Sequence, residues 1–324
     1  MSVLVTGAAG FIGFHVCRRL LQAGEQVFGV DNLDDGYDVG LKQARVEQLQ
    51  KWRGFAFACR DVAEERFADD VAAGDEVSGI VHLAAQSAVR KSLQEPFAYG
   101  RNNIHGHLVM CELARRLQER GRLRHFLFAS SSSVYGGNEK IPSGTEDAVE
   151  KPLSLYAASK RCDEVLTQAY VRLFGFAATG LRFFTVYGSW GRPDMALFQF
   201  AEAILNDREI VLFNGGDMER DFVYIDDVAA GIVSALAKPP PAGELRLYNL
   251  GSGRMESLGR VVSVLEDAVG KKARVRLAPM QPGDPQRSCA DMSGFWRDFG
   301  FAEAVSIDQG IPVAVDWYRD FYGV

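Results

Sequence analysis

The chain has 324 residues, of which 47% are hydrophobic and 24% are charged, a balance typical of a globular protein with a large core. Its formal net charge of −6 argues against nucleic acid as a partner, because nucleic-acid-binding proteins present a basic surface. No apolar run approaches the ~20 residues of a membrane-spanning helix, and five widely spaced cysteines without a CxxC pair fit free thiols in a reducing compartment. We therefore expect a cytoplasmic protein without a metal site and without a membrane partner.

Short apolar runs alternate with amphipathic segments through the first half of the chain. Strand-like runs lie at residues 3–8, 26–32, 55–61, 79–85 and 125–131. Helix-like patterns lie at residues 13–24, 41–52, about 63–73, and 96–121. Apolar runs without clean alternation, separated by helices, are typical of a parallel sheet that is covered on both faces. The sequence therefore predicts an α/β fold with a Rossmann-type doubly wound parallel sheet.

After about residue 175 the loops lengthen and glycine and proline become frequent. Residues 179–188 still form a strand-like run, 238–243 are a turn or short linker, and 310–322 form an amphipathic terminal helix. We expect a cofactor-binding domain over 1–175 and a smaller, loop-rich α/β domain that mainly binds the substrate over 176–324. Some segments of the second half are expected to return to the first domain.

Three glycines directly follow the first strand and open the first helix. Gly7, Gly10 and Gly13 have the spacing GxxGxxG rather than the GxGxxG of the common dehydrogenase fingerprint. Glycine lets a backbone turn tightly and approach a pyrophosphate, whose charge is met by free N–H groups at the helix N-terminus. A plain tight turn is the alternative, but the strand, the turn and the helix together favour a dinucleotide site.

Two aspartates end the next strands. Asp31 follows the second strand, where an acid accepts hydrogen bonds from an adenosine ribose and repels a 2′-phosphate, so NAD is favoured over NADP. Asp61 follows the third strand and either reaches the adenine edge or caps the strand end, and the two interpretations stand equal. The expected cofactor contacts also include Phe11, Ile12, Asn32, Val62, Leu83, Ala84 and Ala85.

An acid–base pair is predicted in the stretch SLYAASK. Tyr156 lies four residues before Lys160, a spacing that places both side chains on one face of a helix. A free phenol has a pKa of about 10 and is a weak base at neutral pH. A neighbouring ammonium and an oxidised nicotinamide both favour the phenolate. Such pairs are common by chance, but one that follows a dinucleotide turn indicates catalysis.

These features resemble the short-chain dehydrogenase/reductase superfamily, in the extended branch that includes the nucleotide-sugar epimerases and dehydratases. Further matches are HLAAQSAVR, NNIHG, RFFTVYG, RDFVYIDDV and QPGD with CAD, so the resemblance covers essentially the whole chain. Within the branch, SSSSVYGGNEKIP, RFFTVYGSWGRPDMALFQF and ERDFVYIDDV are most similar to the UDP-glucuronate 4-epimerases. The resemblance implies tightly held NAD, a UDP-sugar substrate and a homodimer built from helices of the cofactor domain.

The resemblance also implies roles near the cofactor. Tyr156 matches the family's base, and Lys160 matches the residue that binds the ribose and favours the phenolate. Ser131 matches the hydroxyl beside the reacting oxygen of the sugar. Asn103 in NNIHG matches a position near the cofactor.

Further positions are implied for the substrate. Thr185 is expected to face the sugar or the diphosphate, and Arg90 is also expected to contact the substrate. Arg220 and Asp284 match residues that hold the nucleotide part. Arg192 is the candidate partner for a hexuronate carboxylate, because a guanidinium matches a carboxylate with two parallel hydrogen bonds. The alternative for Arg192 is a surface arginine in a Gly/Pro loop.

The four consecutive serines at residues 130–133 bear on the type of reaction. In the family that the chain resembles, 4,6-dehydratases carry an Asp-Glu pair where this chain has Ser132 and Ser133, and decarboxylating relatives keep the glutamate. Serine cannot act as a carboxylate acid or base, but it can hydrogen-bond the sugar. We expect Ser131, Ser132 and Ser133 to contact the substrate.

The resemblance thus implies C4 epimerisation of UDP-glucuronate to UDP-galacturonate through a transient 4-keto intermediate. The main alternative is a UDP-glucose or UDP-N-acetylglucosamine 4-epimerase. Less favoured are a UDP-glucuronate decarboxylase and a 4,6-dehydratase. A non-catalytic NAD sensor is disfavoured by the intact Tyr156/Lys160 pair.

Overall fold

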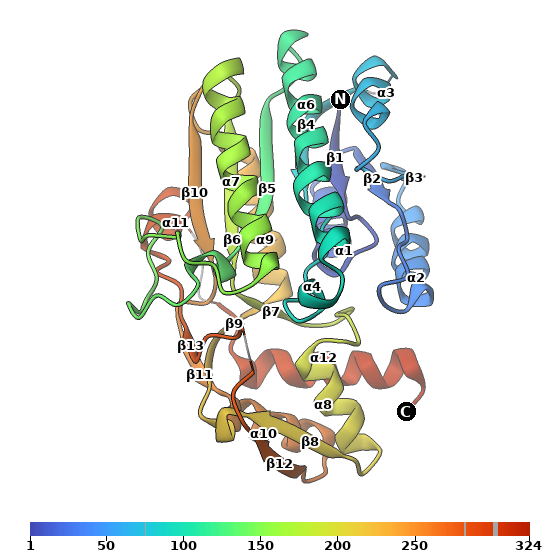
Figure 1. The fold of residues 1–324 in the computed structure, drawn as a ribbon. Coiled ribbons are helices and arrows are strands. Elements are labelled where there is room, and N and C mark those ends of the chain that lie inside the picture. The colour runs from blue at the N-terminus through green and yellow to red at the C-terminus, as the bar shows by residue number, and fades with distance from the viewer. Residues whose placement is uncertain (75, 282, 301–303) are drawn as a thin grey trace.

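A seven-stranded, all-parallel sheet forms the centre of the computed structural model, which describes residues 1–74, 76–281, 283–300 and 304–324 (Figure 1). The strand order is β10-β6-β5-β4-β1-β2-β3. The strands are β1 (Ser2–Thr6), β2 (Val27–Asp31), β3 (Phe55–Cys59), β4 (Val77–His82), β5 (His125–Ser131), β6 (Ala178–Phe183) and β10 (Leu245–Leu250). The predicted α/β fold with a doubly wound parallel sheet is confirmed.

The sheet is covered on both faces, as its apolar strands require. Every residue of β4 and β6 is buried. Because side chains alternate between the faces of a strand, Val3 and Val5 pack into one hydrophobic cluster and Leu4 into another. The inner strands β4 and β6 therefore lack polar alternation because neither of their faces meets water.

Two groups of helices supply the covering layers (Figure 1). One layer contains α1 (Phe11–Gln22), which contacts both α2 (Val39–Gln50) and α9 (Ile225–Ala237). The other contains α3 (Arg66–Gly74), α6 (Gly106–Glu119) and α7 (Leu155–Phe174). Short helices α4 (Lys91–Gln94) and α5 (Pro96–Tyr99) precede α6.

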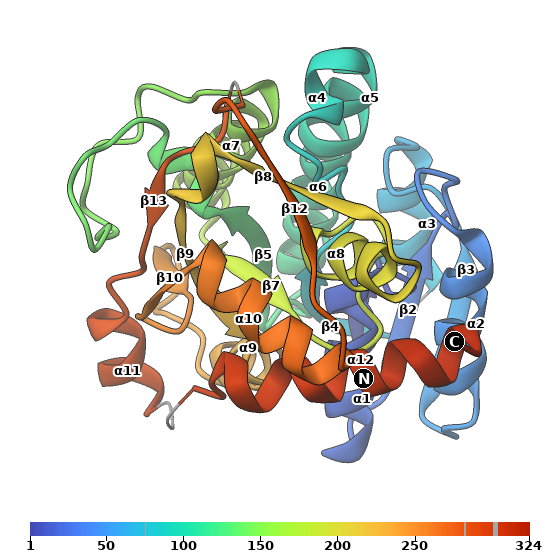
Figure 2. The same cartoon turned by 90° about the horizontal axis from the view of Figure 1, so that it is seen from below.

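A smaller part lies beyond the carboxyl ends of the central strands (Figures 1 and 2). Its strands form two small sheets, one of β8 (Glu209–Phe213) with β12 (Arg274–Ala278), and one of β7 (Thr185–Tyr187), β9 (Glu219–Tyr224), β11 (Met255–Ser257) and β13 (Arg287–Ser288). Its helices are α8 (Ala196–Leu205), α10 (Leu258–Val269) and α12 (Ile307–Tyr322), while α11 (Ser293–Phe299) packs beside β10. The parallel strands thus end towards this smaller part, which places their carboxyl ends where a ligand site is expected.

Two expected elements are divided in the structure. The long helix predicted over 96–121 consists of α5, a π-helix (Gly100–His105) and α6, and π-helical turns often mark functional sites. The strand predicted over 179–188 is β6 followed by β7, which leaves the central sheet and pairs with β9. The helical course continues through the first break and the apolar residues Phe183 and Phe184 continue through the second, which is why the sequence does not reveal them.

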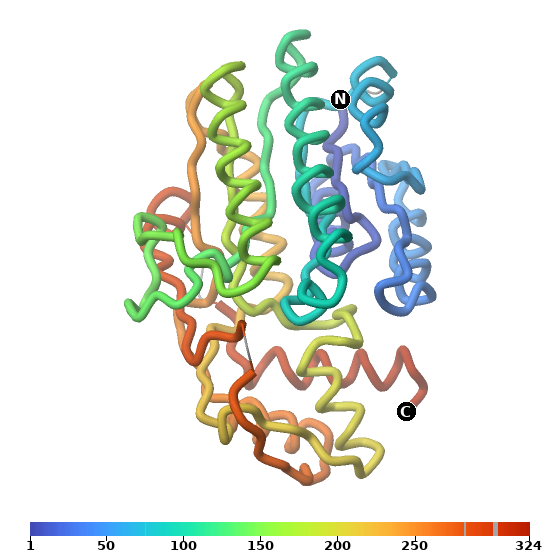
Figure 3. Tube along the Cα trace, in the orientation of Figure 1, coloured from blue at the N-terminus to red at the C-terminus, as the bar shows by residue number. Residues whose placement is uncertain are grey.

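The chain crosses between the two parts more than once. Figure 3 shows the orange trace of β10 returning to the edge of the central sheet, where β10 pairs with β6. The division between 1–175 and 176–324 stays a prediction. Within the described ranges, no helix is long and apolar enough to cross a membrane.

Candidate active site

A cavity of about 440 Å³ lies at the carboxyl ends of the central strands. Most of the predicted site residues line it: Gly7, Gly10, Phe11, Ile12, Gly13, Asp31, Asn32, Asp61, Val62, Leu83, Ala84, Ala85, Ser131, Ser132, Ser133, Tyr156, Lys160, Thr185 and Arg192. Four predicted residues, Asn103, Arg90, Arg220 and Asp284, do not line it. One cavity therefore contains both the cofactor residues and the acid–base pair that the sequence predicts.

The glycine turn is built for a close backbone approach. Gly7 has a φ of +69°, and a Cβ there would lie 2.9 Å from the backbone nitrogen of Ala84. A Cβ at Gly13 would lie 2.0 Å from the carbonyl oxygen of Gly7, closer than any side chain permits. The N-cap Gly10 offers no side-chain acceptor to the first turn of α1, so the N–H groups of that turn are free to bind an anion.

Asp31 ends β2 beside this turn. Its two carboxylate oxygens accept hydrogen bonds from the backbone N–H groups of Ala9 (3.1 Å) and Leu33 (2.9 Å). Burial raises the pKa of Asp31, while the nearby Lys42 charge acts to lower it. A carboxylate accepts more than one hydrogen bond per oxygen, so Asp31 keeps capacity for ribose hydroxyls. The glycine turn and Asp31 together fit the adenosine diphosphate part of NAD.

Asp61 also lines the cavity, but its carboxylate already has partners. Its Oδ1 accepts a hydrogen bond from the N–H of Ala63 (2.8 Å), and its Oδ2 pairs with Nη1 of Arg101 (2.7 Å). The capping role that the sequence left open is therefore present, and a contact with adenine stays a prediction.

Arg45 is a buried cation that the sequence reasoning missed. Its guanidinium donates to the carbonyl of Ala9 (2.8 Å), the hydroxyl of Tyr37 (2.7 Å) and the carbonyl of Trp190 (2.5 Å). It thereby joins the glycine turn to the loop that carries Arg192. The sequence contains a signal for the burial of Arg45. Residues 41, 45 and 49 share one face of α2, and Leu41 and Leu49 are both buried.

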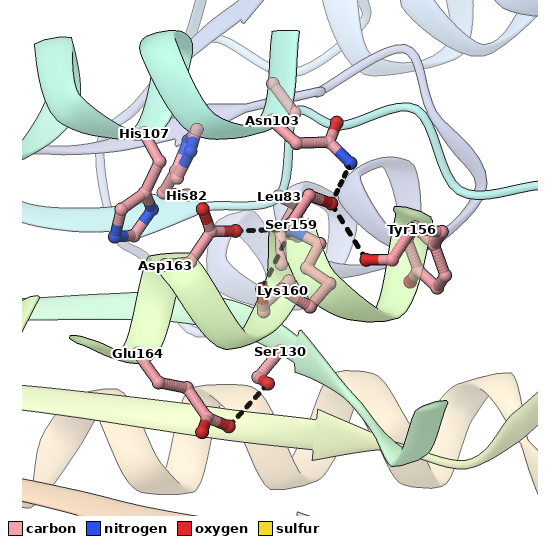
Figure 4. A network of polar contacts seen from close by, with 12 residues as sticks. His82, Leu83, Asn103, His107, Ser130, Tyr156, Ser159, Lys160, Asp163 and Glu164 are labelled. Atoms are coloured by element: carbon pink, nitrogen blue, oxygen red, sulfur yellow. Dashed lines mark hydrogen bonds and ion pairs between the residues drawn. The ribbon is translucent and has the colours of Figure 1, made fainter. Parts of the chain in front are cut away.

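Tyr156 and Lys160 extend from α7 towards the end of β5 (Figure 4). Both are almost fully buried, with 9% and 3% of their surfaces exposed. Nζ of Lys160 donates to the carbonyl of Ala129 (3.1 Å) and to Oδ2 of Asp163 (3.0 Å). The predicted acid–base pair thus lies on one face of a helix, and its ammonium is held from two sides.

The four serines after β5 differ in their contacts. Ser130 is buried and donates to Oε1 of Glu164 (2.7 Å), which also pairs with Arg182 (2.8 Å). Ser131 caps a short 3-10 helix (Ser132–Tyr135), where its hydroxyl accepts the N–H of Ser133 (3.1 Å). Ser131, Ser132 and Ser133 all line the cavity. Ser130 lines the cavity as well, but its hydroxyl is already bound to Glu164.

Asn103 lies behind the cavity wall rather than in it. Its side-chain oxygen accepts the N–H of Gln86 (2.8 Å), and its amide donates to the carbonyl of Gln86 (3.0 Å) and to the hydroxyl of Ser159 (2.9 Å). Ser159 in turn donates to the carbonyl of Tyr156 (2.8 Å) (Figure 4). Asn103 therefore links the Gln86 loop to the start of α7.

Arg192 lines the cavity with its guanidinium already paired. Its Nε and Nη2 donate to the two oxygens of Asp194 at 2.9 and 3.0 Å, and its Nη1 donates to the hydroxyl of Ser87. Sequence reasoning did not single out Asp194, although it stands only two residues after Arg192. The two-bond geometry expected for a carboxylate ligand is thus present, with Asp194 as the partner.

The other three predicted substrate residues come together outside this cavity. Arg90 pairs with Asp284 at 3.3 Å, and its guanidinium carbon lies 4.7 Å from the ring centre of Phe213. Arg220 donates to the carbonyls of Glu219 (3.0 Å) and Gln286 (2.9 Å). Burial lowers the pKa of Arg220, and the charge of Asp284 opposes that shift. Residues almost 200 positions apart therefore form one charged group.

The fold and the cavity define a doubly wound α/β protein whose candidate ligand site lies at the carboxyl ends of the parallel strands. Residues 3–251 match the NAD dependent epimerase/dehydratase family, and the chain belongs to that family. A probable UDP-glucuronate 4-epimerase of Rhizobium meliloti is 42% identical over 99% of this chain and 98% of its own length.

Solved structures give the same grouping. The UDP-glucuronic acid 4-epimerase from Bacillus cereus, in complex with UDP-glucuronic acid and NAD, matches with a TM-score of 0.91 and 32% identity over 99% of this chain and 100% of that one. The UDP-glucose 4-epimerase of Thermotoga maritima, with UDP-glucose, matches with a TM-score of 0.87 and 29% identity over 99% and 100% of the two chains. The neighbours therefore include epimerases of both charged and neutral sugars.

Proposed function

We propose that this protein is an NAD-dependent UDP-glucuronate 4-epimerase, which converts UDP-glucuronate into UDP-galacturonate through a transient 4-keto intermediate. One observation carries the proposal: a single cavity contains the glycine turn, the Tyr156/Lys160 pair, three serines without a carboxylate among them, and the guanidinium of Arg192. The relatives that are named UDP-glucuronate 4-epimerases support this substrate over a neutral sugar.

NAD is the proposed cofactor, held at the turn of Gly7, Gly10 and Gly13 with its ribose hydroxyls on Asp31. NAD bound there would supply the acceptor and the donor for the hydride of C4. The chain's own part is to hold the proton and the charge. The Lys160 ammonium, 3.0 Å from Asp163, favours the phenolate of Tyr156, and Tyr156 takes the proton of the 4-hydroxyl and later returns it.

The serines restrict the reaction to epimerisation. Ser131 hydrogen-bonds the reacting oxygen, and Ser132 and Ser133 contact the sugar without supplying a carboxylate. Dehydration needs a group that helps to expel the 6-hydroxyl, and loss of CO2 from a 4-keto-uronate is favoured by an added acid. A site with three hydroxyls at these positions supplies neither group.

The substrate carboxylate is proposed to bind Arg192, with Thr185 beside the sugar and diphosphate. Because Asp194 occupies the guanidinium fork, the substrate must share or replace that pair. The group of Arg90, Arg220 and Asp284 is proposed to hold the nucleotide end of the substrate.

The test is to incubate the purified protein with UDP-glucuronate and to separate the nucleotide sugars. UDP-galacturonate is the expected product, with UDP-glucose and UDP-N-acetylglucosamine turned over far more slowly. A UDP-pentose or a 4-keto-6-deoxy sugar contradicts the proposal, and faster turnover of a neutral sugar favours the alternative. A Tyr156→Phe variant that folds and retains NAD serves as the inactive control.

A homodimer is the proposed assembly, formed through helices of the cofactor domain. Three apolar side chains on these helices are exposed to solvent: Phe97 on α5 (91%), and Val165 (53%) and Leu173 (73%) on α7. Light scattering after gel filtration tests this, and a monomer with these residues intact contradicts it. The cytoplasmic location stays a prediction.

A further inference from the structure

Asp163 is a buried carboxylate on the same helix face as Tyr156 and Lys160. The three residues are spaced i, i+4 and i+7, so they follow one another along α7. Figure 4 shows Asp163 directed at the Lys160 side chain. Oδ2 of Asp163 lies 3.0 Å from Nζ of Lys160, and the two side chains are 0% and 4% exposed.

This contact defines how the ammonium is held. An ammonium has three N–H donors, and among the described residues Lys160 directs hydrogen bonds to Ala129 and Asp163. Lys160 also lines the cavity, which leaves its remaining donor for a ligand. Within the same described part of the chain, Oδ1 of Asp163 has no hydrogen-bond partner. The carboxylate therefore interacts mainly with Lys160, and it is not part of a wider bonding network.

The other titratable groups around Asp163 do not compete for this role. Glu164, on the same helix, is bound by Arg182 and Arg161. His107 on α6 has its pKa lowered to about 3, by burial first and by the Lys160 charge second. His82 on β4 has its pKa lowered in the same way, by burial first and by His107 and Lys160 next.

Cys111 on α6 completes this set, and burial raises the pKa of its thiol. The two histidines and the thiol are therefore neutral at ordinary pH. Asp163 differs, because burial raises its pKa only to about 6 while the Lys160 charge opposes the shift. The charged groups in this part of the helix face are consequently Lys160 and Asp163.

We propose that Asp163 is a positioning residue that fixes the Lys160 ammonium against β5 and, through its negative charge, sets the pH range in which Tyr156 takes the substrate proton. The proposal rests on the proposed function, since it requires Tyr156 and Lys160 to act together. A negative charge beside Lys160 and two helical turns from Tyr156 stabilises the protonated phenol and the protonated amine alike. Removing it must therefore move both ionisations to lower pH.

The deciding experiment is the pH profile of kcat with UDP-glucuronate for the wild type and Asp163→Asn. The amide keeps an acceptor for Lys160 and removes only the charge. Both limbs of the profile are expected to move to lower pH by roughly one unit. A profile that superimposes on the wild type, or a uniform loss of activity at every pH, overturns the proposal.

Arg161→Gln is the matched control. It removes a charge from α7 at the residue next to Lys160, but the Arg161 side chain is 37% exposed and is paired with Glu164. Solvent screens such a charge, so its profile should coincide with that of the wild type. A shift as large as that of Asp163→Asn overturns the proposal, because it would show a general charge effect of the helix.

Two further measurements keep the result interpretable. Turnover of UDP-glucuronate by the wild type, and its loss in Tyr156→Phe, test the proposed function independently of Asp163. If Asp163→Asn shows no cooperative thermal unfolding, the acidic limb of the wild type decides. As the pH falls, protonation of Asp163 removes its negative charge and so makes Tyr156 harder to protonate. The slope of log kcat against pH on the acidic limb should then be below one. A slope of one overturns the proposal.

Discussion

Two carboxylate–cation pairs of similar length hold the cavity-lining residues Lys160 and Arg192. Lys160 and Asp163 are 3.0 Å apart, and Arg192 reaches the two oxygens of Asp194 at 2.9 and 3.0 Å. Their exposures differ greatly, at 4% and 0% for the first pair and 23% and 39% for the second. Distance alone therefore does not distinguish the pairs, and access to solvent does.

Burial determines what each pair can do. Removing one partner of a buried pair leaves an uncompensated charge and costs about 3–5 kcal/mol, so the Lys160–Asp163 pair is a fixed part of the site. An exposed pair is worth about 0–1 kcal/mol, so Asp194 can give way to a substrate carboxylate at little cost. On the proposed function, the site thus combines a buried pair on the helix face of Tyr156 with an exchangeable pair for the substrate carboxylate.

The largest expected effect comes from breaking the fixed pair at its cation. Lys160→Met removes the ammonium that favours the phenolate, and kcat should fall by about 10²–10⁴-fold, the usual contribution of acid–base catalysis. Steady-state turnover of UDP-glucuronate measures it. Lys140→Met is the control, because Lys140 is 68% exposed in its pair with Asp147, and it should leave kcat unchanged. An active Lys160→Met enzyme would remove Lys160 from the mechanism.

The second largest effect is expected from removing the guanidinium of the exchangeable pair, Arg192 with Asp194. Arg192→Ala should weaken the binding of UDP-glucuronate by about 10–100-fold, because a hydrogen bond to a charged group contributes about 1.5–3 kcal/mol. The binding of UDP-glucose, which lacks the carboxylate, should change little, and titration calorimetry compares the two ligands. Arg208→Ala, at a side chain 56% exposed and paired with Glu202, is the control. Full activity of Arg192→Ala on uronates would favour the neutral-sugar alternative.

The parts of this site that could be predicted are those encoded locally. The turn at Gly7, Gly10 and Gly13 and the pair Tyr156/Lys160 each lie within a few residues, and a glycine turn or a helix face follows from such short spacing. Apolar runs likewise predict the sheet, because burial on both faces leaves no polar alternation.

The remaining parts depend on contacts between distant segments. Asn103 is in the matching motif, but its π-helix and its link to Ser159 appear only after α6 packs beside α7. Arg45 reaches Trp190, 145 residues away, and no local pattern shows that. Asp163 and Asp194 stand three and two positions after Lys160 and Arg192, yet only their burial separates a fixed partner from an exchangeable one.

A smaller effect should follow from removing the competitor in the exchangeable pair. Asp194→Asn takes the charge from the guanidinium fork, so UDP-glucuronate should bind up to about fivefold more tightly, within the ~1 kcal/mol of an exposed pair. Titration calorimetry measures this, with Asp207→Asn as the control because Asp207 is 70% exposed and paired with Lys271. Weaker binding would show instead that Asp194 holds Arg192 in place for the substrate.

The smallest effect separates the two pairs without any mutation. Raising the salt concentration from 0.1 M to 1 M shortens the screening length from about 10 Å to about 3 Å, which weakens exposed charge contacts and leaves buried ones nearly unchanged. The preference for UDP-glucuronate over UDP-glucose, taken as a ratio of dissociation constants, should fall by roughly two- to threefold. The limbs of the kcat profile should stay in place, because Lys160 and Asp163 are shielded from the added ions by their burial. If the limbs of the kcat profile also move with salt, solvent ions reach the Lys160–Asp163 pair. The two pairs would then differ only in how strongly they are screened.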